Sequence, residues 1–151
     1  MTQRLNINEI IPGAMKALGG VHGYLHSQTH LPKNLVDLVF LRVSQINGCA
    51  YCIDMHSRDL LKGGMTIDKL VLVPVWDEAG NLFDERERAA LAWAETVTNV
   101  AATGVPEADY AAAAKVFSEK DLADLTVAIG IMNAYNRLGV TFRLTPAAVA
   151  A

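Results

Sequence analysis

The sequence LVDLVFLRVSQINGCAYCIDMHSRDLLK, residues 35–62, contains two helical patterns separated by Asn47-Gly48. In the first pattern, apolar residues recur at spacings of three and four, which predicts a helix that begins near Pro32 and ends at the Asn-Gly pair. A second helix is expected from about Cys49 to Lys62, because Gly63-Gly64 can adopt the left-handed conformation that terminates helices. Both cysteines would then lie in the first turn of the second helix.

Helical periodicity dominates the rest of the chain as well, whereas the alternating pattern of β-strands is scarce. We therefore predict an all-α helical bundle, formed as a single domain over residues 1–151. The other expected elements are a helix from about Asn8 to Thr29, a short helix from an N-cap at Thr66 to about Leu72, a loop from Pro74 to Phe83, a helix from a capping box at Asp84 and Glu87 to about Val100, a helix that begins at Pro106, and a nearly apolar central helix that follows Ser118 and Asp121.

Composition limits the kinds of function. A net charge of -3 and a pI near 5.7 argue against binding to nucleic acid or to an acidic lipid surface, because both require basic patches. The chain lacks the long apolar run of a membrane span and the pattern of a signal peptide, so we expect a cytoplasmic protein. Its apolar fraction of 52% is slightly high and favours a homo-oligomer.

The chemically informative motif is Cys49-Ala50-Tyr51-Cys52 followed by His56. Residues three and four apart share one face of a helix, so the two thiols and the imidazole can meet. A helix N-terminus and a nearby imidazole both favour the thiolate, which can attack a peroxide and then form a disulfide with the neighbouring thiol. The spacing does not say which cysteine attacks, because the helix dipole favours Cys49 whereas His56 stands one turn after Cys52.

Other interpretations of these residues compete with the redox one. Two cysteines can be small buried apolar residues, and the same three groups could bind zinc with Asp37 or another histidine as the fourth ligand. Structural zinc sites usually draw ligands from two separated clusters, which makes the redox interpretation stronger. Asp37 alone would be read as a helix-surface charge.

The segment VSQINGCAYCIDMH, residues 43–56, resembles the core of AhpD-like alkylhydroperoxidases in the carboxymuconolactone decarboxylase family. The similarity continues through Trp76, FDERERAALAWAE at 83–95 and NAYNR at 133–137, and so covers most of the chain. It implies an all-helical fold with its redox core at about residues 32–64, homo-oligomers built from apolar helix faces, and reduction of peroxides by a cysteine pair without a bound cofactor.

The resemblance also implies roles for individual residues. Cys52 would be the peroxidatic cysteine and Cys49 the resolving one, with His56 in a proton relay. The family places a glutamate twelve positions before the first cysteine, and this chain has Asp37 there, one methylene shorter. A general base must lie within hydrogen-bond distance, directly or through one water, so this departure affects the expected rate more than the reaction type. Tyr51 replaces a further histidine of AhpD itself.

Together these features predict a thiol-dependent peroxidase that reduces a hydroperoxide and is regenerated by an external dithiol. The alternatives are a non-redox enzyme of the same family, in which His56 and Asp37 would move protons during decarboxylation of a cyclic lactone acid, and a redox-sensing module. Three further groups of residues are secondary candidates. His22, His26 and His30 form a ladder that could hold a metal, and Trp76 and Phe83 could wall a substrate mouth or cover a core edge. Asn133 and Asn136 are expected to be hydrogen-bonded residues in helix packing.

Overall fold

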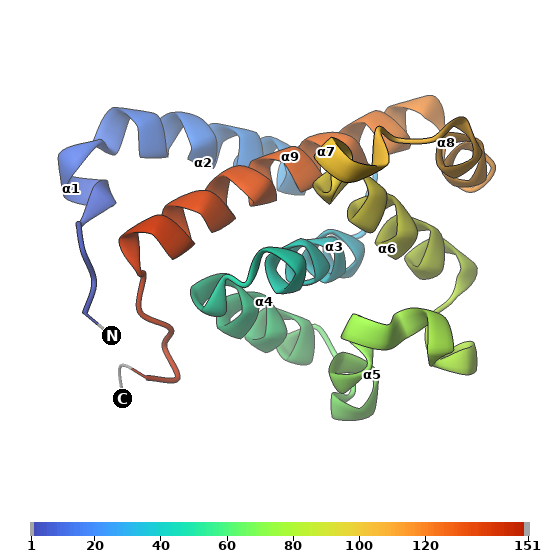
Figure 1. Ribbon diagram of the computed structural model, residues 1–151, viewed down its shortest axis with the longest axis horizontal. Helices are drawn as coiled ribbons and strands as arrows, with labels where there is room; N and C mark the ends of the chain where they lie inside the picture. The colour runs from blue at the N-terminus through green and yellow to red at the C-terminus, as the bar shows by residue number, and fades with distance from the viewer. Residues whose placement is uncertain (1, 150–151) are drawn as a thin grey trace.

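The fold is seen in a computed structural model that describes residues 2–149, and within this range it consists of helices without a β-strand. The expected all-α class is therefore confirmed (Figure 1). The elements in chain order are α1 (Ile7–Ile10), α2 (Pro12–Ser27), α3 (Lys33–Asn47), α4 (Ala50–Lys62), α5 (Ile67–Val71), the 3-10 helices η1 (Val73–Glu78) and η2 (Gly80–Leu82), α6 (Glu85–Thr98), α7 (Val100–Thr103), α8 (Glu107–Ala114) and α9 (Glu119–Phe142).

Helix α3 is the centre of the bundle and packs against α4, α6 and α9 (Figure 1). Every residue from 35 to 41 is buried, so this helix has no solvent-exposed face along that stretch. A helix covered on all sides must be apolar around its circumference, which explains the run of leucine, valine and phenylalanine. Asp37 is the one charged residue within this apolar run, and it is buried as well, at 2% exposure.

Two apolar clusters meet on α3. One lies mainly among α3, α6 and α9 and includes Phe40, Leu125 and Ile129, with both cysteines at its margin. The other includes Leu41, Leu60 and other buried residues of α3, α4, α5 and α6. The two cysteines are thus attached to a packed core rather than to a mobile loop.

Most helix boundaries agree with the sequence signals. Gly48 adopts the left-handed conformation that ends α3, with φ of +67°. Thr66 and Ser118 accept N-cap hydrogen bonds, and Asp84 forms the predicted capping box with Glu87. These residues set the turn between α3 and α4 and the starts of α5, α6 and α9.

The structure corrects three boundaries. The first predicted helix is divided into α1 and α2 at Ile11, because Pro12 has no N–H and restricts the residue before it. The predicted loop from Pro74 to Phe83 contains two 3-10 helices, and α6 ends at Thr98 rather than near Val100.

The segment before α1 lies beside the C-terminal end of α9 (Figure 1). The backbone N–H of Arg4 donates to the carbonyl of Phe142 at 2.9 Å, and the Arg4 guanidinium donates to the carbonyl of Thr141. Within the described range, no helix combines the length and apolar character that a membrane crossing requires.

Candidate active site

The α3–α4 turn positions the cysteines. Gly48 reverses the chain, and Cys49 then occupies the N-cap of α4, one position earlier than the first turn we expected. Its backbone N–H donates to the Ser44 carbonyl at 3.0 Å, which ties the N-cap to the end of α3. The sulfur atoms of Cys49 and Cys52 lie 2.8 Å apart as free thiols, and the two residues are 1% and 3% exposed. The expected meeting of the two thiols is confirmed.

Helix α9 approaches the thiols at Gly139. A Cβ atom at Gly139 would lie 2.8 Å from the Cys49 sulfur and 3.8 Å from the Cys52 sulfur. These distances leave no room for a larger residue. The absence of a side chain at this position therefore creates the space that the dithiol occupies.

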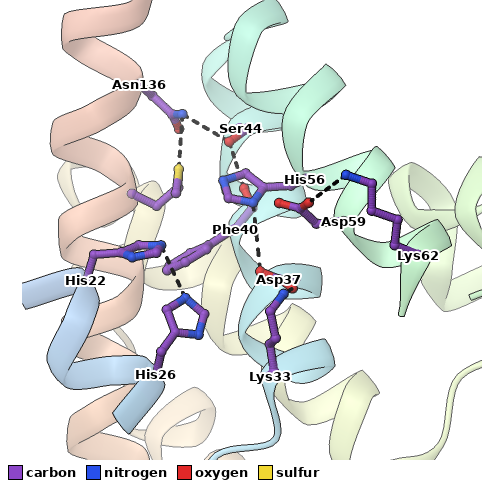
Figure 2. Close-up of polar contacts among 11 residues, drawn as sticks. His22, His26, Lys33, Asp37, Phe40, Ser44, His56, Asp59, Lys62 and Asn136 are labelled. Carbon is purple, nitrogen blue, oxygen red and sulfur yellow. Dashed lines mark hydrogen bonds and ion pairs between the residues drawn. The ribbon is translucent and has the colours of Figure 1, made fainter. Parts of the chain in front are cut away.

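A buried amide network lies beside the dithiol. Asn136, at 1% exposure, donates from Nδ2 to Ser44 Oγ at 3.0 Å, and its Oδ1 accepts from Asn47 Nδ2 at 3.0 Å. Asn47 Nδ2 also lies 3.0 Å from Asn133 Oδ1. Figure 2 shows Asn136 reaching from α9 to Ser44 on α3. The hydrogen bonding expected for Asn133 and Asn136 is confirmed, and Asn136 also faces the sulfurs.

The two thiols differ in acidity. A hydrogen bond from Cys52 lowers the pKa of Cys49 to about 7, and backbone N–H groups of α4 together with the Asn136 amide act in the same direction. The same hydrogen bond, together with burial, raises the pKa of Cys52. Cys49 is the more acidic thiol because it accepts a hydrogen bond from Cys52 and, to a smaller extent, faces the N–H groups at the start of α4.

His56 is buried beside the pair at 2% exposure, and neither of its ring nitrogens has a hydrogen-bond partner among the described residues. Its ring packs against Phe40 with centroids 5.1 Å apart. Burial lowers the pKa of His56 to about 4, so the imidazole is neutral at pH 7.

Asp37 lies near His56 but outside hydrogen-bond distance. Its Oδ1 is 3.9 Å from His56 Nδ1, while its Oδ2 accepts a hydrogen bond from Lys33 Nζ (Figure 2). A glutamate would extend further by one methylene. The structure thus brings all four predicted site residues into one region, with a gap in the expected contact between carboxylate and imidazole.

A pocket of about 280 Å³ opens onto Cys52 and His56. Cys49 is not among its lining residues. The walls come from both ends of the chain as well as from α4, and they are mainly apolar: Ile7, Asn8, Met15, Gly19, His22, Tyr51, Met55, Met132, Tyr135, Leu138 and Leu144. The pocket is of a size and character suited to a small organic molecule.

His22 belongs to this pocket, which the sequence analysis did not predict. It is half-buried, its ring stacks on Phe40 at 5.8 Å, and its Nε2 lies 3.2 Å from that of His26 (Figure 2). Burial lowers its pKa. His30 lies beyond the end of α2 at Ser27, so the histidine ladder has two members. No set of three or more potential metal ligands is clustered in residues 2–149.

The two aromatic residues near the 3-10 helices lie away from the pocket. Phe83 is 2% exposed in the second apolar cluster, and Trp76 packs against that cluster while its indole N–H donates to Glu95 Oε1. Neither lines the pocket at Cys52. Of the two interpretations, covering a core edge is the one the structure supports.

The chain is similar to known proteins over most of its length. Residues 12–96 match the model of the carboxymuconolactone decarboxylase family. The uncharacterised protein YdfG of Bacillus subtilis is 33% identical over 140 residues, which are 93% of this chain and 94% of YdfG. A crystal structure of ATU0492 from Agrobacterium tumefaciens, a protein of unknown function with the suggested name antioxidant defence protein AhpD, matches with a TM-score of 0.91 at 36% identity over 96% of this chain and 98% of that one. An uncharacterised peroxidase-related protein from Silicibacter sp. TM1040 shares the fold, with a TM-score of 0.79 at 22% identity over 89% of this chain and 71% of the other.

Proposed function

Because the chain belongs to the carboxymuconolactone decarboxylase family, we propose that it is a thiol-dependent peroxidase of the AhpD-like kind. The observation that carries the proposal is the position of Cys52, which lines an apolar pocket beside His56 and contacts a second thiol at 2.8 Å. Cys52 borders the pocket that a substrate would enter, and the Cys49 sulfur is close enough to form a disulfide once Cys52 is oxidised.

In the proposed reaction, the Cys52 thiolate attacks the terminal oxygen of a hydroperoxide. The O–O bond breaks, Cys52 becomes a sulfenic acid, and the alkoxide takes a proton to leave as the alcohol. The Cys49 thiolate then attacks the sulfenic sulfur, the S–S bond forms and hydroxide leaves. An external dithiol reduces the disulfide and is itself oxidised. His56, with Asp37 behind it, handles protons on the pocket side.

The proposal is tested by mixing the reduced protein with cumene hydroperoxide and following the peroxide and the protein mass together. Wild type loses about two hydrogens and consumes one equivalent. Cys52→Ser does not react, whereas Cys49→Ser completes one turnover and retains a sulfenic acid that dimedone traps. A wild-type protein that stays reduced would contradict the proposal.

Decarboxylation of a lactone acid is the weaker candidate. It would require a group that holds the substrate carboxylate, and no lysine or arginine is among the described residues that line the pocket. That reaction would also leave the dithiol without a role.

We further propose that the chain assembles as a homo-oligomer. Several large apolar side chains are exposed, including Ile10 at 59%, Ile67 at 58% and Val71 at 61%. Light scattering at micromolar concentration tests this proposal, and a mass of 16.3 kDa would contradict it.

A further inference from the structure

The more acidic thiol and the thiol that lines the pocket belong to different cysteines. Cys49 stands at the N-cap of α4, where helix N–H groups stabilise a negative charge, but it does not line the pocket. Cys52 lines the pocket but lies inside the first turn. The sulfur that holds a negative charge most readily is therefore not the sulfur that a substrate reaches.

His56 is poorly placed to deprotonate Cys52. Asp37 Oδ1 is 3.9 Å from His56 Nδ1 and the carboxylate is engaged by Lys33, so an imidazolium would have no hydrogen-bonded counter-charge. Burial lowers the pKa of His56 to about 4, which makes it a weak base at neutral pH. Another group beside Cys52 must accept its proton efficiently.

We propose that Cys49 is the general base that activates Cys52: the Cys49 thiolate takes the Cys52 proton across the 2.8 Å contact as the Cys52 sulfur attacks the hydroperoxide. The inference rests on the proposed peroxidase function and gives the first cysteine a role before its role in disulfide formation.

The steps balance from a singly deprotonated dithiol. The S–H bond of Cys52 breaks and an S–H bond forms on Cys49, while the Cys52 sulfur bonds to the terminal peroxide oxygen and the O–O bond breaks. The proton on Cys49 then passes to the departing alkoxide, directly or through water or His56. Cys49 is again a thiolate and attacks the sulfenic sulfur, which releases hydroxide. The net reaction converts a dithiol anion and hydroperoxide into a disulfide, an alcohol and hydroxide.

The surroundings of the pair favour this exchange. Gly139 of α9 lets the Cys49 sulfur lie beside Cys52, and the Asn136 amide favours the charged form of both sulfurs. The titratable or charged groups around the pair and its pocket are Tyr51 and His56 from α4, Asp37 and Lys33 from α3, His22 from α2, Tyr135 from α9 and, beside Gly48 in a separate groove, Arg143 after α9. Apart from the thiols, the two histidines are the groups that ordinarily titrate near neutral pH.

The test measures the pH dependence of Cys52 reactivity in two ways, by single-turnover reaction with cumene hydroperoxide and by mass-resolved alkylation with iodoacetamide. In the wild type, both rates rise through a midpoint near pH 7, the pKa of the dithiol set by Cys49. Cys49→Ser slows the peroxide step about 10²-fold at pH 7, within the usual span for a general base, and moves both midpoints above about pH 8.5, the ordinary range of an isolated thiol.

Two further variants test whether Cys49 or His56 acts as the base. Cys49→Asp places a carboxylate, a favourable N-cap, at the same position, and it restores part of the single-turnover rate without allowing a disulfide. His56→Gln slows the peroxide step but keeps the midpoint near pH 7. An unchanged midpoint in a folded Cys49→Ser protein, or its loss in His56→Gln, overturns the inference. The alkylation profiles decide the role of Cys49 even where hydroperoxide is not consumed, an outcome that would refute the peroxidase function separately.

Discussion

Gly139 lies directly against Cys49, so that a Cβ atom added at Gly139 would lie 2.8 Å from the Cys49 sulfur. Gly130 is on the same helix and has no heavy atom within 4 Å of the corresponding position. The two glycines lie on the same helix, but only Gly139 has a side chain packed against it, so Gly130 is a matched control.

We predict opposite effects of alanine at these two sites. Gly139→Ala overpacks the site and lowers the free energy of unfolding by about 1–3 kcal/mol, and it slows disulfide formation because Cys49 is displaced. Gly130→Ala raises the free energy of unfolding by roughly 0.5–1 kcal/mol through helix propensity alone. Urea denaturation and stopped-flow oxidation measure both effects. If both variants had the same stability and the same rate of disulfide formation, the close approach of α9 to Cys49 would be refuted.

Asn136→Asp is expected to raise the pKa of Cys49 above about 7, because a carboxylate would replace an amide that favours the thiolate. Iodoacetamide alkylation against pH measures this shift. Asn133→Asp is the control, since Asn133 Oδ1 already acts as an acceptor for Asn47 and Arg137. A larger shift in the control would show that the effect is long-range electrostatics rather than contact.

Asp37→Glu tests the gap beside His56. The longer side chain can close the 3.9 Å separation, and a nearer carboxylate should raise the pKa of His56 above about 4. NMR titration of the imidazole measures this change. Lys33→Met is the companion variant, since it frees the Asp37 carboxylate without lengthening it. If the imidazole titrates identically in wild type and Asp37→Glu, the carboxylate does not reach it.

Acid should destabilise the protein through His56. Its pKa is lowered from 6.5 to about 4 in the folded state, so the unfolded chain takes up a proton first as the pH falls. The free energy of unfolding is therefore fully retained above pH 6.5, and the contribution of about 3 kcal/mol is lost progressively towards pH 4. His56→Gln should flatten this part of the pH profile in thermal unfolding. A parallel decline in both proteins would assign the acid sensitivity to other groups.

The sequence predicted those features that depend on neighbouring residues. Asn47-Gly48 indicated the turn because a left-handed residue is needed there, and Asp84 with Glu87 indicated a helix start because both capping hydrogen bonds are local. The spacing of Cys49, Cys52 and His56 was sufficient to place them on one face of a single helix. Local rules of this kind explain why the fold class and the dithiol could be predicted.

Contacts between distant segments were not predictable in the same way. Gly139 appeared as an ordinary glycine in an apolar helix, although it contacts a cysteine ninety positions earlier. His22 appeared as part of a histidine ladder, although packing turns it into the Cys52 pocket. The polar Asn136 within apolar α9 was the available signal for the amide network, but its partners on α3 depend on how the two helices cross.

Much of the pocket wall comes from other parts of the chain than the reacting sulfurs. Ile7, Met15 and His22 come from the first helices and Leu138 and Leu144 from the last segment, whereas the thiols and imidazole come from α4 in the middle. Substitutions at wall positions such as Ile7, Met15 and Leu144 can therefore alter which molecules enter without replacing the residues that react with them. Substrate preference and reactivity are separable properties in this architecture, and each can diverge while the other is kept.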